Sequence, residues 1–334
     1  MSQTSIASAI CAVCTFIITV LILRRLIPVL KSKKMGQPIL EIGPRWHKSK
    51  EGTPAMGGVS FIAASALVGT AACIYFGVTK GASAIAPLIL TLTYGVLCGL
   101  IGMIDDLAKL RKRQNEGLRA WQKLALQIIT ASLYVAALAI FCEVTTKMYI
   151  PFVDVTVDLG VWYYIIAVIL LAGVDNSVNL NDGIDGLCSS ITLVVGIFFL
   201  AVSLAREGGD NVSLSVMSSL IIGSAAGFLV YNFYPARIFM GDTGSLFFGA
   251  VVCGCAFILG NPLIIVVAGF VYIIETLSVI LQVAYFKLTH GKRLFKMAPI
   301  HHHFEKCGFS EIKIVVTFTL ATVILCAVAW FGLK

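Results

Sequence analysis

The chain has 334 residues and a formal net charge of +8; 58% of its residues are hydrophobic and only 13% are charged. Because a soluble domain carries roughly 25% charged residues, this composition excludes an ordinary soluble protein and indicates a membrane protein. The basic residues flank apolar segments and form no separate domain, so we expect no nucleic-acid partner.

Apolar runs of about 20 residues, the length at which a helix crosses a bilayer, recur along the whole chain. They predict an all-α, polytopic membrane protein whose ten transmembrane helices lie near residues 5–27, 54–78, 85–104, 122–141, 160–175, 186–205, 212–231, 244–260, 262–286 and 312–332. No polar stretch is long enough for a second folded unit, so we expect a single domain over residues 1–334. The 10 cysteines show neither a disulfide framework nor a zinc-site spacing.

The basic residues predict how these spans are oriented. All but four of the 25 Lys and Arg lie at the loops that follow odd-numbered spans, and the exceptions are Lys80, Lys147, Arg206 and Lys334. The positive-inside rule therefore places those loops in the cytoplasm and both termini outside. The first span is not a cleaved signal peptide, because its basic residues follow the apolar stretch.

Asp105 and Asp106 end the third predicted span, where two adjacent carboxylates oppose the helix dipole and repel each other. One interpretation is a solvated helix end that is paired with Lys109 or Arg113. The other is a site for a divalent cation and a phosphate, where the metal offsets the repulsion.

The polar segment 176–186, after the fifth span, contains no Lys or Arg and is therefore not an ordinary positive-inside loop. Asn179, Asp182 and Asp185 are spaced by three and share one face if the segment is helical. An EF-hand is excluded, because Leu193 stands where its terminal Glu is needed. The segment is either a polar turn with an Asp cap on the next helix or part of a binding site.

Asp242 precedes the eighth span, so it fits both a helix N-cap and an anion site with its metal. His301, His302 and His303 could bind a metal, bind phosphate or form a polar loop. We favour donors to a phosphate or sugar over a zinc site. The glycines and proline of residues 52–58 predict a backbone turn that can receive an anion.

Five sequence strings together resemble the phospho-N-acetylmuramoyl-pentapeptide translocase family of the polyprenyl-phosphate N-acetylhexosamine-1-phosphate transferases. The strings are residues 52–58, 104–106, 179–186, 239–245 and 299–305, and the resemblance covers essentially the full length. The second to fourth strings belong to the wider superfamily, whereas the first and last favour the muramoyl-pentapeptide branch over the branch that uses UDP-N-acetylglucosamine. Ala55 stands where many relatives have Thr.

This resemblance implies transfer of phospho-MurNAc-pentapeptide from UDP-MurNAc-pentapeptide to undecaprenyl phosphate, giving lipid I and UMP at the bacterial cytoplasmic membrane. It implies a Mg²⁺ requirement, with Asp242 as metal ligand, and with Asp105 and Asp106 binding metal and positioning or activating the lipid phosphate. The implied substrate-binding residues are Lys48, Thr53, Asn179, Asp182, Asp185, Asn232, Phe239, Gln282, His301, His302 and His303, with Phe239 stacking on uracil. A homodimer is left open.

Two other classes of protein also carry intramembrane acids. An ion-coupled transporter has them near the bilayer midplane, whereas these acids lie at one predicted face. An intramembrane aspartyl protease needs two facing aspartates within helices, and its motif has Gly where Phe239 stands. Binding of a uridine nucleotide would separate the transferase from both alternatives.

Overall fold

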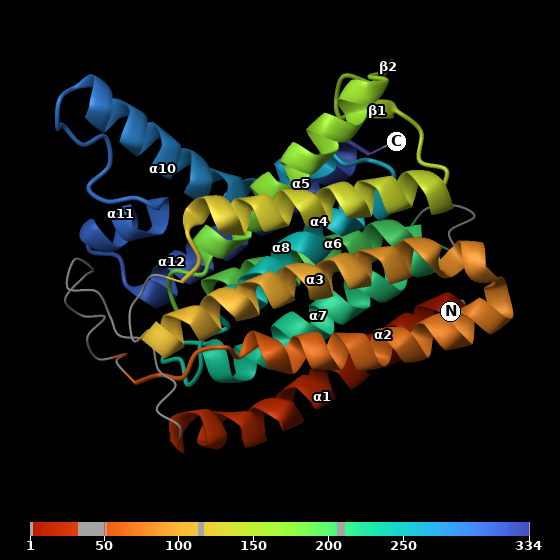
Figure 1. The fold of residues 1–334 in the computed structure, drawn as a ribbon, viewed down its shortest axis with the longest axis horizontal. Coiled ribbons are helices and arrows are strands. Elements are labelled where there is room, and N and C mark those ends of the chain that lie inside the picture. The colour runs from red at the N-terminus through yellow and green to blue at the C-terminus, as the bar shows by residue number, and fades with distance from the viewer. Residues whose placement is uncertain (1–2, 33–49, 51, 113–116, 206–210, 334) are drawn as a thin grey trace.

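Helices account for almost all of the regular structure (Figure 1). The computed structural model describes residues 3–32, 50, 52–112, 117–205 and 211–333. Within them the elements are α1 (Gln3–Ser32), α2 (Gly58–Lys80), α3 (Ala82–Lys112), α4 (Ala120–Phe141), β1 (Lys147–Ile150), β2 (Val155–Asp158), α5 (Val161–Asn181), α6 (Leu187–Ala205), α7 (Val212–Asn232), α8 (Gly241–Ile258), α9 (Ile264–Ala268), α10 (Phe270–Leu288), α11 (Ile300–Lys306) and α12 (Glu311–Phe331). Ten helices in these ranges are long and apolar enough to cross a membrane, which confirms the predicted number of spans.

The fifth span is longer than the hydrophobic pattern predicted. α5 continues to Asn181 instead of ending near residue 175. In its polar last turns, side chains bond back to carbonyls of the helix without breaking it: the Asn176 amide donates to the Ala172 carbonyl at 2.8 Å and the Ser177 hydroxyl donates to the Gly173 carbonyl at 2.7 Å. Half of the polar segment expected as a loop is therefore rigid helix.

Other short elements were not predicted from hydrophobicity. β1 and β2 form an antiparallel hairpin that pairs Lys147 with Asp158. The ninth predicted span, 262–286, is divided at Gly269 into the short helix α9 and the spanning helix α10. The histidine segment forms the two-turn helix α11. The hairpin, α9 and α11 all lack the apolar run of about 20 residues that identifies a span.

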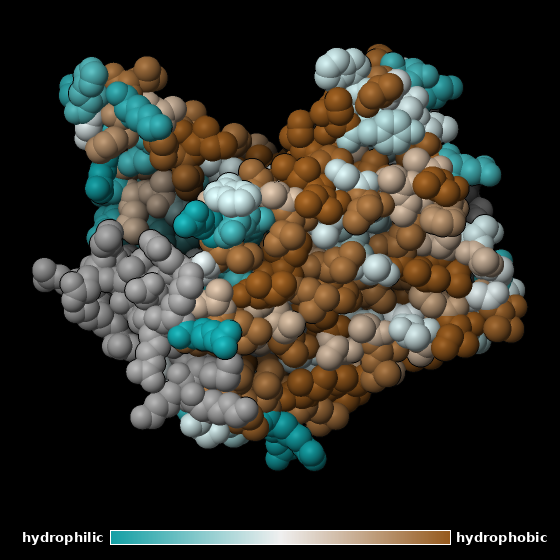
Figure 2. All heavy atoms as spheres, viewed as in Figure 1, coloured by the Kyte–Doolittle hydropathy of each residue, from teal (hydrophilic) through white to brown (hydrophobic). Residues whose placement is uncertain are grey.

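Both chain ends and the hairpin lie at one end of the helical bundle, and the end of α3 and α11 lie at the other (Figure 1). Figure 2 shows hydrophobic residues over the middle of the visible face and hydrophilic residues mostly toward its ends. This distribution suits a bundle whose middle faces lipid and whose ends face water. α10 leans away from the bundle, and the surface is hollowed between α10 and α5 (Figures 1 and 2).

α8 is the central helix, with almost every residue buried against its neighbours, chiefly α3 and α5. Two glycines allow other helices to touch its first turn. A Cβ on Gly58 would overlap the backbone of Gly244, and a Cβ on Gly102 would overlap the backbone carbonyl of Asp242. The start of α8 is thus pressed against the end of α3, which sets the position of the acidic residues there.

Candidate active site

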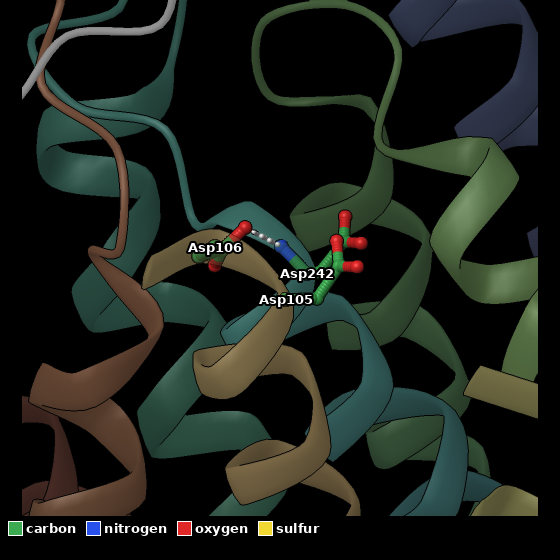
Figure 3. Close-up of side chains that lie close together, drawn as sticks. All are labelled: Asp105, Asp106 and Asp242. Atoms are coloured by element: carbon green, nitrogen blue, oxygen red, sulfur yellow. Dashed lines mark hydrogen bonds between the residues drawn. The ribbon is translucent and has the colours of Figure 1, made fainter. Parts of the chain in front are cut away.

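Three carboxylates meet where the end of α3 contacts the start of α8. One oxygen each from Asp105, Asp106 and Asp242 lies within 4.8 Å of the others. Figure 3 shows the carboxylates of Asp105 and Asp242 side by side, while Asp106 turns toward the backbone of Asp242. Asp105 and Asp106 are only 3% and 1% exposed, so the helix end is not solvated, but the expected pairing with Lys109 is confirmed at Asp105.

Asp106 caps α8 from the neighbouring helix. Its Oδ1 accepts the Asp242 N–H at 3.1 Å, and its Oδ2 accepts the N–H and the hydroxyl of Thr243 at 3.0 and 2.7 Å. These N–H groups belong to the first helical turn, which has no carbonyl partners of its own. Asp242 makes no side-chain cap, so the N-cap interpretation of Asp242 is wrong and its carboxylate is left for other partners.

Two lysines from other parts of the chain reach the Asp242 carboxylate. Its Oδ2 lies 3.0 Å from Lys109 Nζ on α3 and 2.8 Å from Lys123 Nζ on α4. Lys109 also pairs with Asp105 Oδ2 at 2.7 Å. The sequence interpretation used both lysines as orientation signals and named Lys109 only as the partner of a solvated helix end, so neither was included in the site. For Lys109 the i, i+4 spacing from Asp105 was an available signal.

Asn179 on α5 connects these groups. Its amide nitrogen donates to Asp242 Oδ1 at 3.1 Å and to Ser245 Oγ at 2.8 Å. Its Oδ1 accepts a hydrogen bond from Lys123 Nζ at 2.9 Å. One side chain therefore fixes the relative positions of α4, α5 and the first turns of α8.

A polar cavity of about 220 Å³ opens beside the carboxylates. It is lined by Lys50, Lys109, Asn179, Asp182, Gly183, Ile184, Asp185, Asn232, Phe239, Gly241 and Asp242. Five of the expected substrate-binding residues thus share one cavity with Asp242. The volume is below the roughly 300–1,000 Å³ of a pocket that encloses a whole ligand, so the cavity can take one part of a larger substrate.

Asp182, the C-cap residue of α5, is the carboxyl of this cavity that is not held by a described side chain. It is half-buried, and its side chain accepts no hydrogen bond from the described residues. Burial and the negative charges of Asp242, Asp106 and Asp185 raise the pKa of Asp182 to about 8. Near neutral pH the group therefore keeps its proton and can donate a hydrogen bond.

Asp185, in contrast, is fully engaged by the protein. Its Oδ1 pairs with Lys50 Nζ at 2.8 Å, and its Oδ2 accepts the Ala236 N–H at 2.9 Å. Lys50 also pairs with Glu311 Oε2 at 2.6 Å, which ties the cavity wall to the start of α12. Glu311 was not predicted, because it lies outside the motif strings, six residues after the last of them.

Asn232 is also engaged. Its Oδ1 accepts the Gly186 N–H at 3.1 Å, and its amide donates to the Ile238 carbonyl at 3.0 Å. Phe239 is half-buried in the cavity wall, with its N–H bonded to the Pro54 carbonyl at 2.9 Å. Asn232 therefore shapes the wall, and Phe239 presents an aromatic surface to the cavity.

The remaining expected residues lie outside this cavity or outside the described residues. Thr53 follows Lys50 in a turn, with its N–H bonded to the Lys50 carbonyl at 3.1 Å. Gln282 on α10 accepts the N–H groups of Leu294 and Phe295 at 3.0 and 2.8 Å, so it holds the loop before α11. Lys48 lies outside the described residues.

The three histidines have different surroundings. His301 and Glu275 are both buried, with Nδ1 and Oε2 at 3.0 Å. His301 Nε2, which has no hydrogen-bond partner in the described part of the chain, lies against Gly183 of the cavity wall. His302 Nδ1 pairs with Glu305 Oε2 at 2.6 Å. His303 Nδ1 accepts the N–H of Lys296 at 3.1 Å. Only His301 therefore adjoins the cavity, oriented by a glutamate that sequence reasoning missed.

An apolar groove of about 860 Å³ runs between α4 and α5. Its lining extends from Ile140 and Tyr164 to Leu124 and Asn176. Leu124 follows Lys123, which contacts Asp242, so the groove ends next to the carboxylate site. A long apolar chain in this groove could therefore present a polar head to the site.

The carboxylate set fits a divalent cation. Asp105 and Asp242 offer neighbouring carboxylate oxygens, the hard ligands that Mg²⁺ and similar ions prefer. The same two carboxylates attract two ammonium groups. Asp106 contributes less to such a site, because both of its oxygens already bond to the start of α8.

Comparison with known proteins identifies relatives along most of the chain. The sequence model of the family described as glycosyl transferase family 4 matches residues 88–260, which include all three clustered carboxylates. A phospho-N-acetylmuramoyl-pentapeptide-transferase of Clostridium novyi is 45% identical over 308 residues, covering 92% of this chain and 91% of its own. Proteins of the same name from Clostridium acetobutylicum and Clostridium perfringens are 44% and 42% identical, covering 92% and 96% of this chain and 93% and 97% of their own.

Proposed function

The chain belongs to the phospho-N-acetylmuramoyl-pentapeptide-transferase family, and from this premise we propose that the acidic end of its bundle transfers phospho-MurNAc-pentapeptide from UDP-MurNAc-pentapeptide to undecaprenyl phosphate. The products are lipid I and UMP, as peptidoglycan synthesis requires. One observation carries the proposal: Asp105, Asp242 and two lysines lie between a polar cavity and the end of an apolar groove. This is where a soluble nucleotide sugar and a lipid phosphate could meet.

In the net reaction, the bond between the sugar-bearing phosphorus and the UMP oxygen breaks, and UMP leaves with the electron pair. A bond from that phosphorus to an oxygen of the lipid phosphate replaces it. Lys109 and Lys123 are placed to donate N–H groups to phosphate oxygens and so reduce the repulsion between two anionic substrates. Magnesium held by Asp242 and Asp105 would add charge neutralisation as a Lewis acid.

The cavity suits the uridine part of the donor. Asp182 can donate a hydrogen bond, and Phe239 offers an aromatic surface on which uracil could stack. Asp185 and Asn232 support this wall through their bonds to Lys50 and to the Gly186 N–H. The small volume leaves the sugar and peptide outside the cavity, toward the rim where His301 and Thr53 are proposed to act.

The membrane placement extends the same proposal. The ten apolar helices make the chain a multi-pass membrane protein. The basic residues favour the site end as the cytoplasmic face of a bacterial cytoplasmic membrane, with both termini outside. A single domain over residues 1–334 and a homodimer stay predictions.

The direct test is transfer from UDP-MurNAc-pentapeptide to a short polyprenyl phosphate by the purified chain in detergent. We expect UMP release that depends on the acceptor, stops with EDTA and returns with Mg²⁺. UDP-N-acetylglucosamine is the matched control donor. Transfer from that donor and not from the pentapeptide donor would overturn the assignment to the muramoyl branch.

Filling the α4–α5 groove should selectively impair the lipid substrate. Gly173 lines the groove, and a Cβ there meets no atom within 4 Å, so a larger side chain would extend into the lipid path. We expect Gly173→Leu to raise the KM for polyprenyl phosphate about tenfold, equivalent to ~1.4 kcal/mol, with little change for the nucleotide donor. Gly173→Ala is the control, and equal changes in both KM values would contradict a lipid groove.

The raised pKa of Asp182 predicts how nucleotide binding depends on pH. Below about pH 8 the carboxyl is protonated and can donate to the nucleotide, and above it the carboxylate repels the phosphate. In EDTA, UMP affinity measured by calorimetry should therefore fall between about pH 7.5 and 9. The neutral variant Asp182→Asn should not show this fall. A parallel fall in the variant would assign the effect to another group.

A further inference from the structure

We propose that Asp175 and Gln127 are positioning residues, which form a polar layer one helical turn below the acidic site and keep α4, α5 and α8 in register. The layer holds Lys123 and Asn179 where they meet Asp242. This inference rests on the proposed function, because it assigns how that site is kept assembled. Asp175 belongs to no motif of the family resemblance, and the reaction described above does not use it.

Both layers are formed by residues of the same three helices, α4, α5 and α8. In the upper layer Lys123 of α4 donates to Asn179 of α5, and Asn179 donates to Ser245 of α8 at 2.8 Å. One turn deeper along α4 lies Gln127, and one turn deeper along α5 lies Asp175. One turn deeper along α8 is Gly249, where an added Cβ would overlap the backbone and carboxyl of Asp175. Each residue of the lower layer therefore lies one turn below a residue of the upper layer on the same helix.

The hydrogen bonds of the lower layer join α4 to two consecutive residues of α5. The Gln127 amide nitrogen donates to Asp175 Oδ2 at 2.7 Å. The Gln127 Oε1 accepts from the Asn176 amide at 2.9 Å. Asn176 also lines the apolar groove, so the layer extends from the groove wall to α8. These bonds restrict both the rotation and the sliding of α5 against α4.

Asp175 is a costly residue for a purely structural role. It is fully buried inside a spanning helix, and its Oδ1 has no hydrogen-bond partner among the described residues. An apolar side chain would fill the same space without that desolvation cost. An ionisable group retained within a span therefore indicates a functional constraint. The constraint identified by the geometry is the alignment of Asn179, which lies one turn nearer the site on the same helix.

A loss of this layer should reduce turnover more than stability. Helices move as rigid units, so a small rotation of α5 would shift Asn179 away from Asp242 and Ser245. Displacements of about 1 Å at a reacting site can cost about 10²-fold in rate. Removal of groups that orient metal ligands has a typical cost of 10–100-fold in activity or metal affinity.

The test compares Asp175→Ala with Asp175→Asn in the full-length protein. Asn keeps an oxygen that can accept the Gln127 hydrogen bond, whereas Ala removes it. We expect kcat per folded molecule to fall roughly 10–100-fold in Asp175→Ala and to stay near wild type in Asp175→Asn, with KM for both substrates little changed. If Asp175→Ala does not fold, Gln127→Leu breaks the same hydrogen bond and is judged in the same way.

The matched control is Thr91→Val, which breaks the buried 2.8 Å hydrogen bond between Thr91 and Tyr134, another bond between spanning helices. It should lower thermal stability in detergent while kcat per folded molecule stays unchanged. A normal kcat in folded Asp175→Ala, or an Asp175→Asn variant as impaired as Asp175→Ala, would overturn the proposal.

A second measurement does not depend on turnover. Binding of Mn²⁺ to the purified protein without substrates, followed by electron paramagnetic resonance, should weaken roughly tenfold or more in Asp175→Ala and be retained in Asp175→Asn. The wild type and the variants could show this pattern of Mn²⁺ binding while the wild type transfers no sugar phosphate. In that case the proposed function fails and the positioning role stands. Equal Mn²⁺ affinity in wild type and Asp175→Ala would overturn the positioning role.

Discussion

Asp242→Asn is expected to reduce transfer by roughly 10³-fold or more while the protein still folds in detergent. A metal supplies several kcal/mol of charge stabilisation in such reactions, and each ~1.4 kcal/mol is a factor of ten in rate. The neutral amide would weaken metal binding and the attraction to Lys109 and Lys123, which both contact Asp242 Oδ2. Because Asp106 and not Asp242 caps α8, the substitution removes no helix cap.

The measurements are UMP release at saturating Mg²⁺ and thermal unfolding of the same preparation. Asp158→Asn is the control, since Asp158 is an exposed aspartate in β2, at the other end of the bundle. It should leave transfer unchanged. Near-normal, magnesium-dependent turnover in Asp242→Asn would contradict the assignment of Asp242 as the metal ligand.

Lys123→Met is expected to lower kcat roughly 10²-fold. Lys123 Nζ bonds to Asp242 Oδ2 at 2.8 Å and to Asn179 Oδ1 at 2.9 Å, so it is the cation through which α4 joins the site. Losing one preorganised donor to a developing charge typically costs 10²–10³-fold. Met retains the length and apolar stem of the side chain, so the loss reports the ammonium group.

Lys287→Met provides the matched control, because it makes the same change in charge at an exposed position on α10. Its kcat should equal that of wild type. Lys123→Arg should recover only part of the activity, since the planar guanidinium is not interchangeable with a compact ammonium group at such a site. If Lys123→Met and Lys287→Met have the same kcat, Lys123 contributes nothing to the reaction.

The membrane class and the number of spans were determined by the sequence alone. Long apolar runs need no information about neighbours, because a helix satisfies its own backbone hydrogen bonds in lipid. Local motifs likewise identified Asp105, Asp106 and Asp242, and the structure brings their carboxylates together. The end of α5 at Asn181 was not predicted, because polar residues interrupt the apolar run while the backbone stays helical.

The partners of these residues were decided only by the tertiary structure. Lys123 meets Asp242, Glu275 meets His301, and Asp106 caps a helix whose residues lie far away in the chain. A single sequence shows which residues are polar and apolar, but not which helices become neighbours or how they rotate. That arrangement depends on close packing, such as Gly102 against the start of α8, and it decides which carboxylate becomes a cap and which stays open to a ligand.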